Sequence, residues 1–249
     1  MSILLYGVLC YAVFLATFLY LMGFVTDVAV PRTVDRGGTP AAGLEHWILD
    51  LSLVALFGLQ HAVMARRGFK RRWTRIVPAA AERSTFVLAT CAVLALLFWS
   101  WRPIPEVVWT VQQPLAWWAL TVVGGAGWAI VLLSTFLIDH FALFGLRQAW
   151  MAFRDRHDPA PRFVTRGFYR YVRHPLMTGF LLAMWATPHM TVGHLLFAAA
   201  ITGYVLLGTA LEERDLLAAH PAEYPAYRER TPALLPLGRR RVPLASRTG

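Results

Sequence analysis

The sequence predicts an all-α integral membrane protein, in which four transmembrane helices precede a proline-broken C-terminal helical hairpin to give five to six spans. Hydrophobic residues make up 57% of the 249 residues and charged residues only 15%, whereas a soluble domain carries about 25% charged residues. Apolar runs recur along the chain, with lengths near the roughly 20 residues that a helix needs to cross a bilayer. Basic residues gather between these runs, which is typical of membrane proteins.

The first half of the chain begins with two such runs. Residues 3–26 are too long for the apolar region of a signal peptide and lack both a basic start and a small-residue cleavage pattern, so we interpret them as a span. Residues 45–64 form the second run, which ends just before Arg66 and Arg67. Cys10 and Cys91 fall inside apolar runs, and we interpret them as small buried hydrophobic residues, because framework disulfides are typical of small secreted domains.

Two further spans are predicted over residues 84–101 and 115–138. In the later one, Gly124, Gly125 and Gly127 would permit the close approach of a neighbouring helix. Tryptophans near the ends of these two spans are typical of an aromatic belt at a membrane surface. They are Trp99, Trp101, Trp109, Trp117 and Trp118.

The last apolar stretch is interrupted by Pro188. A proline inside a helix removes a backbone hydrogen bond and bends or breaks the helix. Residues 176–187 alone are too short to cross a bilayer, so we expect a hairpin that enters the membrane and returns. This hairpin would join two pairs of charged residues at one membrane surface, where they would suit a zwitterionic ligand: Arg173 with His174, and Glu212 with Glu213.

The distribution of basic residues predicts the topology. In loop 66–83, Glu82 is the single acidic residue among many basic ones, so we place this loop in the cytoplasm. Both termini and loop 139–174 then fall on the same side, and the other loops fall outside. The net charge of +10 follows from this topology and needs no nucleic-acid partner. The tail residues Arg239, Arg240 and Arg241 are expected to contact anionic lipid.

Ionisable residues within or beside the spans are candidates for function, because the bilayer makes them costly. Asp50 and His61 fall on one face of the second span, and Asp139 and His140 close the fourth. If that helix continues, Arg147 shares a face with His140. The structural alternatives are that Asp50 packs against a polar neighbour and that the other residues mark the ends of spans. Two histidines beside the hairpin turn are expected to be solvated: His189 and His194.

Residues 165–236 contain, in order, Arg173-His174-Pro175, Gly179, Glu212-Glu213-Arg214, Tyr224-Pro225-Ala226-Tyr227 and Pro236. This order and spacing resembles the isoprenylcysteine carboxyl methyltransferase family. The resemblance implies an integral-membrane methyltransferase with a cytoplasmic C-terminal site for S-adenosylmethionine and no Rossmann domain. The chain has no Gly-x-Gly-x-x-Gly motif. Met177 and Ala219-His220-Pro221 depart from the usual family residues. Because these departures remove no charged group, we expect them to affect the affinity for the cofactor and not its identity.

The resemblance implies roles for the C-terminal residues. The carboxylate of S-adenosylmethionine would suit Arg173 or Arg214 through a charge-assisted pair, and His174 could hold the same end. Glu212 and Glu213 would suit the ammonium group or the ribose hydroxyls. Three tyrosines could pack on the adenine: Tyr169, Tyr224 and Tyr227. Pro175 and Gly179 would let the backbone come close to the ligand.

The N-terminal half adds two motifs, Gln60-His61-Ala62-Val63-Met64-Ala65-Arg66 and Asp139-His140-Phe141 followed by Phe144-Gly145-Leu146-Arg147-Gln148. They resemble the bacterial methanethiol S-methyltransferase group of the same superfamily. This implies methylation of a small thiol, methanethiol, to dimethyl sulfide. Because the thiolate is the nucleophile, a base is needed. The pair Asp139-His140 is our first choice, with His61 next and Arg147 stabilising the thiolate.

Two alternatives stay open, namely carboxyl methylation of a prenylcysteine or other lipidic substrate, and a non-catalytic membrane sensor or transporter on the same scaffold. No metal is predicted, because the chain shows no Cys/His ligand spacing. We find no internal repeat and predict one membrane domain. Within it, residues 1–138 would shape the acceptor site, residues 139–237 would bind the cofactor, and residues 238–249 would be a flexible tail.

Overall fold

The computed structural model describes residues 1–39, 43–159 and 163–236. Arg162, the Arg239–Arg241 run and the tail predicted over residues 238–249 lie outside the described residues. Five of the described helices are long and apolar enough to cross a membrane, which identifies an integral membrane protein: α1 (Ser2–Thr26), α2 (Leu44–Ala65), α4 (Ala79–Ser100), α5 (Pro114–Ile138) and α9 (Val192–Ala219).

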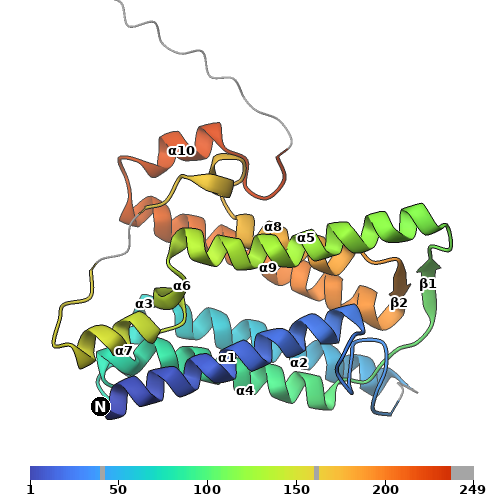
Figure 1. Ribbon diagram of the computed structural model, residues 1–249, viewed down its shortest axis with the longest axis horizontal. Helices are drawn as coiled ribbons and strands as arrows, with labels where there is room; N and C mark the ends of the chain where they lie inside the picture. The colour runs from blue at the N-terminus through green and yellow to red at the C-terminus, as the bar shows by residue number, and fades with distance from the viewer. Residues whose placement is uncertain (40–42, 160–162, 237–249) are drawn as a thin grey trace, which may run out of the picture.

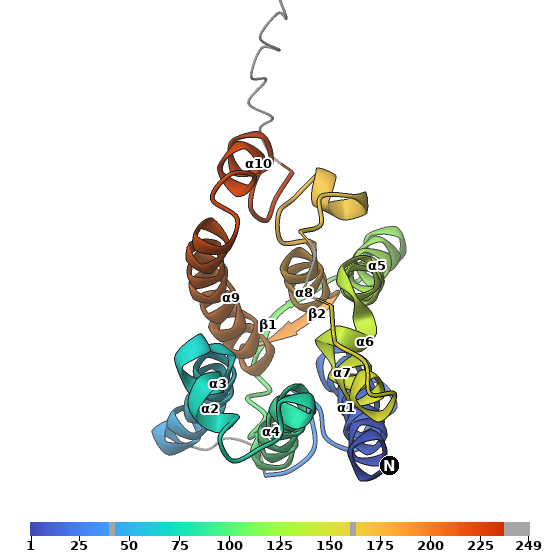
Figure 2. The ribbon, with the colours of Figure 1, turned by 90° about the vertical axis from the view of Figure 1, so that its left-hand side faces the viewer.

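Shorter elements connect and cover these helices (Figure 1). They are α3 (Arg67–Trp73), β1 (Val107–Thr110), α6 (His140–Leu143), α7 (Leu146–Phe153), a 3-10 turn (Gly167–Arg170), α8 (Pro175–Trp185), β2 (His189–Thr191) and α10 (Tyr224–Arg230). The long helices lie side by side in two layers, with α1, α2 and α4 in one and α5, α8 and α9 in the other. Figure 2 views the end of the molecule that carries the N-terminus, α3, α7 and α10.

The hairpin takes the predicted form of two apolar helices separated at Pro188. Helix α8 has 11 residues, so its length is about 16 Å, roughly half of a bilayer core of about 30 Å. The chain then runs in non-helical form to β2, which lies at the end of the molecule opposite to α10 (Figure 1). Helix α9 returns from there. The described chain therefore has five full-length helices and one crossing that is only half helical.

Helices α5 and α8 approach each other closely through glycine, as predicted for the fourth span. A Cβ atom on Gly127 would lie 2.5 Å from the backbone nitrogen of Ala183, and one on Gly124 would lie 2.7 Å from the carbonyl oxygen of Ala186. Gly179 faces α5 in the same way, with the Gly127 carbonyl 2.7 Å from its missing Cβ. Gly125 differs, because nothing lies within 4 Å of its missing Cβ. Two of the three glycines predicted for close packing therefore provide it.

The end of the molecule opposite to α10 contains a feature that the sequence did not predict. Strands β1 and β2 pair antiparallel, with Val107 opposite Thr191, so the loop between α4 and α5 is hydrogen-bonded to the hairpin turn. The loop after α1 folds over the start of α9, where the Thr191 hydroxyl donates to Asp35. The prediction that His194 is solvated is therefore wrong. His194 is buried, and its Nε2 donates to the Met184 carbonyl at 2.9 Å.

Two other predictions at span ends need correction. The third span begins at Ala79 and not at residue 84, because Pro78 precedes the helix and the charged pair Glu82-Arg83 lies inside its first turns. Trp101 does not belong to a surface belt. It is 1% exposed and donates from Nε1 to the Val34 carbonyl at 3.1 Å, whereas Trp99 is 70% exposed. The packed loop after α1 covers Trp101.

The larger apolar cluster lies mainly in the half of the bundle nearer β1 and β2, and a smaller one is formed by Phe86, Val87 and Cys91. Phe24, Trp101 and Phe197 contact one another edge to face, with ring centroids 5.5 to 5.9 Å apart. Cys10 and Cys91 are buried and form no disulfide, as predicted. The charged and aromatic groups that could perform chemistry lie towards the end of the bundle that carries α10.

Candidate functional site

The two charged pairs meet where α8 begins and α9 ends, as expected from the hairpin. Arg173 Nε donates to Glu213 Oε1 at 2.8 Å. His174 lies between the two carboxylates, with Nε2 3.3 Å from Glu213 Oε1 and Nδ1 3.4 Å from Glu212 Oε2. Arg173, His174 and Glu213 are largely buried, whereas the Glu212 side chain is 52% exposed. Glu212 is therefore the carboxylate of this cluster that a ligand can reach most easily.

The chain after α10 is held against this cluster by backbone hydrogen bonds. The backbone nitrogens of Arg173 and His174 donate to the carbonyls of Pro232 and Ala233 at 2.9 and 3.0 Å. The Arg173 guanidinium also donates to the Thr231 carbonyl. Arg173 is thus fully engaged within the protein, by a carboxylate and by the tail. It offers no free guanidinium to a ligand carboxylate, whereas Arg214 is exposed.

The predicted tyrosines lie beside the cluster. Tyr227 donates from its hydroxyl to the Tyr169 carbonyl at 2.7 Å, and the Phe163 ring packs against Tyr224 and Tyr227 with centroids 6.0 and 5.4 Å apart. Tyr224 is 1% exposed, and its hydroxyl has no hydrogen-bond partner among the described residues. Burial raises the pKa of Tyr224 to about 12; the charge of Glu213 adds to this shift and that of Arg173 opposes it. This hydroxyl stays protonated at neutral pH.

Pro175 and Gly179 were predicted to let the backbone approach the ligand, and in the structure both contribute to the position of α8. Pro175 is buried and begins α8, where the missing N–H of proline costs nothing. Gly179 faces α5 and allows the close contact with Gly127 described above. The structure therefore gives both residues a role in placing α8.

His61 lies on the inner side of α2, within a set of aromatic rings. Its ring is 4.8 Å from Phe86, 5.7 Å from Phe57 and 6.2 Å from Tyr204, measured between centroids. Its Nδ1 atom is buried and has no hydrogen-bond partner in the described part of the chain. Tyr204 stands on α9, eight positions before Glu212 and so about 12 Å from it along the helix axis. His61 Nδ1 thus has no hydrogen-bond partner among the described residues, and Tyr204 connects its surroundings to the helix that carries the charged cluster.

His140 is placed differently, because both of its ring nitrogens are engaged. Thr135 donates its hydroxyl to the Leu132 carbonyl at 2.6 Å, so it must accept the 2.7 Å hydrogen bond from His140 Nδ1. Nε2 then accepts from the Tyr11 hydroxyl at 2.8 Å. The ring also stacks on Phe136, with centroids 4.1 Å apart. Burial lowers the pKa of His140, and the nearby charge of Asp139 opposes this shift. Both ring nitrogens of His140 are thus hydrogen-bonded, and burial favours its neutral form.

Asp139 and Arg147 pair with each other and not with a histidine. The helix breaks at Gly145, which has a φ of 87°, so α6 and α7 are separate and Arg147 does not continue the face of His140. The Arg147 guanidinium instead folds back onto Asp139, and its Nε donates to Asp158 at 2.8 Å. Asp139 also accepts from the backbone nitrogen of Ala142 at 3.1 Å. Two carboxylates neutralise Arg147, which leaves it little charge for a thiolate.

Arg83 is a candidate that the sequence reading did not single out. It is half-buried on α4, donates from Nε to the Leu143 carbonyl at 2.7 Å, and places its guanidinium carbon 5.0 Å from the Phe86 ring. No carboxylate of the described residues lies within ion-pair distance of it. Lys70 is close enough that burial and the charge of Arg83 both lower its pKa. The sequence does contain a feature that could have indicated Arg83. Pro78 is typical of a helix start, so the pair Glu82-Arg83 that follows falls inside a membrane helix.

Asp50 has the structural role that we weighed for it. It is fully buried, and its Oδ1 accepts from the backbone nitrogen of Arg102 at 3.0 Å. This contact lies near the start of α2, far along the helix from His61. Among the residues that the structure describes, no three or more His, Cys, Asp or Glu side chains are grouped to hold a metal ion.

Comparison with known proteins identifies the family of this chain. The model of the NnrU protein family matches residues 50–235. The chain belongs to this family. Within NnrU, it is 51% identical to the methanethiol S-methyltransferase of Mycobacterium tuberculosis over 94% of this chain and 95% of that protein. It is 50% identical to methanethiol S-methyltransferase 2 of Bradyrhizobium diazoefficiens, over 95% of this chain and 90% of that protein. These identities make it a member of the methanethiol S-methyltransferase family.

More distant NnrU relatives are also found. A Nurim homolog of Drosophila pseudoobscura pseudoobscura is 28% identical over 68% of this chain and 69% of that protein. No solved structure matches the chain.

Proposed function

We propose that this NnrU protein transfers the methyl group of S-adenosylmethionine to methanethiol, giving dimethyl sulfide. The observation that carries the proposal is the relation to named methanethiol S-methyltransferases at about half identity over nearly the full length of both chains. The acceptor residues and the donor residues both lie inside the region of similarity. We further propose that both termini and the site face the cytoplasm, because the basic loops lie at that end.

The donor site is proposed at the Arg173–Glu213 cluster. The half-exposed Glu212 carboxylate would bind the ammonium group or a ribose hydroxyl, and the unpartnered Tyr224 hydroxyl would donate to the ligand. Arg214 is better placed than Arg173 to bind the ligand carboxylate, because Arg173 is already paired. S-Adenosylmethionine supplies an electrophilic methyl group on its sulfonium. Arg173, His174 and Glu213 position the surrounding backbone.

The acceptor base is proposed to be His61. Its Nδ1 atom is buried and unpartnered, whereas both nitrogens of His140 are engaged. The S–H proton of methanethiol passes to His61, the thiolate sulfur forms the new bond to the methyl carbon, and the old sulfonium bond breaks. The products are dimethyl sulfide and S-adenosylhomocysteine, and His61 then releases its proton to water. Phe57, Phe86 and Tyr204 provide apolar rings that suit a small methyl thiol.

Arg83 is proposed as a positioning residue for the thiol. Its guanidinium and His61 contact the same Phe86 ring. A positive charge near a thiol favours the thiolate and lowers the pKa of the thiol. With Arg147 neutralised by Asp139 and Asp158, Arg83 is the better source of this charge.

The test is headspace gas chromatography of membranes supplied with S-adenosylmethionine and methanethiol. We expect dimethyl sulfide from the wild type and from the control Glu229→Gln, an exposed acid on α10, and little from Glu212→Gln at limiting donor. A base-labile methyl ester on added prenylcysteine, formed without dimethyl sulfide, would overturn the acceptor. Absence of both products together with absence of S-adenosylhomocysteine binding would overturn the enzyme assignment.

A further inference from the structure

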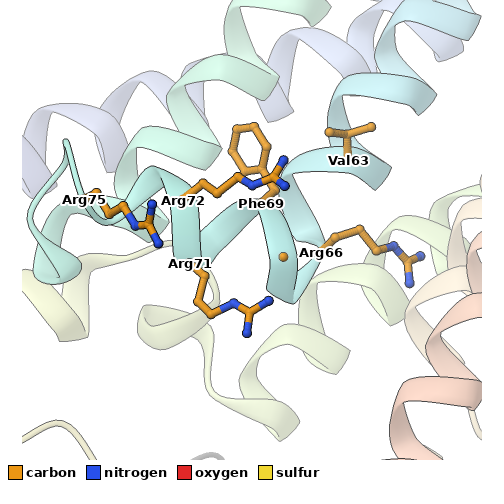
Figure 3. Close-up of a pocket in the computed structure, with 7 residues that line it drawn as sticks. Val63, Arg66, Phe69, Arg71, Arg72 and Arg75 are labelled. Atoms are coloured by element: carbon orange, nitrogen blue, oxygen red, sulfur yellow. The ribbon is translucent and has the colours of Figure 1, made fainter.

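A basic pocket lies outside the proposed catalytic site, at the elbow between α2 and α3. Its volume is about 520 Å³, and its lining includes Arg66, Arg71, Arg72 and Arg75 with the apolar side chains of Val63 and Phe69. In Figure 3 the arginines and Phe69 surround the short helix α3, and Val63 stands on the adjoining end of α2. Among the residues that the structure describes, no acidic side chain lines the pocket.

The charges of this pocket are largely uncompensated. Arg66 pairs with Asp215 of α9 at 3.2 Å, in a half-exposed contact. Arg71, Arg72 and Arg75 are exposed, and no carboxylate of the residues described here forms an ion pair with them. A bound anion near these arginines would offset their positive charge. The arrangement therefore favours an anionic ligand with several acceptor oxygens, as in a phosphate.

The position of the pocket indicates which kind of molecule would carry the phosphate. Helix α3 connects two membrane spans, so it lies at a membrane surface. Val63 is 42% exposed on the last turn of α2, on a face that meets lipid, and Phe69 is half-buried and stacks with Trp73 at 5.7 Å. One side of the pocket is thus apolar and continuous with the lipid-facing surface, and the other is cationic. An amphiphile with a phosphate head matches both sides.

We propose that this pocket is a binding site for the phosphate headgroup of an anionic phospholipid. Arginine donates to phosphate oxygens in a planar fork, which suits this ligand better than isolated lysines would. Basic residues near an anionic membrane surface add to the attraction for the lipid headgroups. The site does not depend on the identity of the methyl acceptor, so its test can fail without affecting the proposed function.

The experiment is native mass spectrometry of the purified full-length protein in detergent, titrated with phosphatidylglycerol or with phosphatidylcholine. The variant is Arg71→Gln/Arg72→Gln/Arg75→Gln, which leaves the Arg66–Asp215 pair intact. The control is Arg156→Gln/Arg170→Gln, two exposed arginines at the same end of the molecule. We expect the wild type and the control to prefer phosphatidylglycerol, and the triple variant to bind it at least about tenfold more weakly.

Two further measurements distinguish a lipid phosphate from free phosphate and test whether the variant is folded. Inorganic phosphate alone, in excess, tests whether the free anion is the ligand. If it displaces the lipid completely and also raises the melting temperature of the wild type but not of the triple variant, the lipid is the wrong source. Equal binding of phosphatidylglycerol by the wild type and the triple variant would overturn the site. A size-exclusion profile and a melting temperature equal to those of the wild type, both measured in lipid-free detergent, would establish that the triple variant is folded.

Discussion

Arg173 Nε lies 2.8 Å from Glu213 Oε1, and this buried ion pair joins the entrance of the hairpin to its exit. The same guanidinium donates to backbone carbonyls of the tail. The pair therefore fixes three separate segments of the chain relative to one another. Its neighbour Glu212 lies 3.4 Å from His174 Nδ1 and is half-exposed.

Glu212 and Glu213 should separate into a binding residue and a structural residue. We expect Glu212→Gln to weaken S-adenosylhomocysteine binding by roughly tenfold or more, the loss of one charge-assisted hydrogen bond, with little change in melting temperature. We expect Glu213→Gln to lower the free energy of unfolding by about 3–5 kcal/mol, because it leaves Arg173 buried and unpaired. Isothermal titration calorimetry and thermal unfolding measure the two effects, and Glu229→Gln is the control. Equal effects of the two changes on both quantities would contradict this division.

His61 should be required for the chemical step but not for donor binding. We expect His61→Gln to lower kcat by about 10²–10⁴-fold, the usual contribution of a general base, while the Kd of S-adenosylhomocysteine stays near that of the wild type. Single-turnover measurements of dimethyl sulfide formation give the rate. If His140→Gln loses more activity than His61→Gln at equal protein stability, the base assignment is wrong.

Arg83 should influence the thiol through charge, and the pH profile can detect this. We expect Arg83→Gln to reduce kcat/KM at neutral pH and to recover part of the loss as the pH rises, because the thiol then ionises without help from the guanidinium. Arg83→Lys should keep more activity than Arg83→Gln at neutral pH. A constant ratio of wild-type to Arg83→Gln activity at all pH values would indicate a structural role only.

His140 should make stability depend on pH in a defined direction. Burial lowers its pKa in the folded protein, so the unfolded chain binds more protons as the pH falls below about 6.5, the ordinary pKa of histidine. The neutral ring therefore contributes its full stability above that pH and loses it as the pH falls towards the folded pKa. We expect the melting temperature of the wild type to fall more on acidification than that of His140→Asn. Parallel curves for the two proteins would rule this out.

The α5–α8 contact gives a matched pair of glycine substitutions in one helix. A Cβ on Gly127 would meet the backbone of α8 at 2.5 Å, whereas a Cβ on Gly125 meets nothing within 4 Å. We expect Gly127→Ala to destabilise the protein by about 1–3 kcal/mol through overpacking and Gly125→Ala to be neutral or slightly stabilising. Thermal unfolding in detergent compares them. A neutral Gly127→Ala would show that the two helices can separate without cost.

Much of the fold could be predicted because hydropathy and proline positions act locally. The length of residues 3–26 and the break at Pro188 are each visible in a short window of sequence. The convergence of His174 with Glu212 and Glu213 then followed from the hairpin geometry. Pairing between distant loops was not predictable in this way, since β1 and β2 are short and carry no alternating pattern of their own.

The site was harder to predict, because the partners of charged groups are set by tertiary structure. Asp139 and His140 are neighbours in sequence, but the turn at Gly145 brings Arg147 back onto Asp139 and leaves His140 to Tyr11. Arg173 carries the right charge for a ligand carboxylate, yet the fold supplies Glu213 first. Sequence spacing indicates which residues meet but not which of them remain free.

The half-helical crossing after α8 has a consequence for how this segment is held in the membrane. Peptide groups that leave a helix inside a membrane need other partners, since each unsatisfied one costs several kcal/mol in lipid. Here His194 donates to the Met184 carbonyl, the Pro188 carbonyl accepts from the Val111 nitrogen, and Trp109 donates to the Thr187 carbonyl. Two of these three partners are translated before α8. We therefore expect residues 175–191 to be stable in the bilayer only when the loop between α4 and α5 is packed against them.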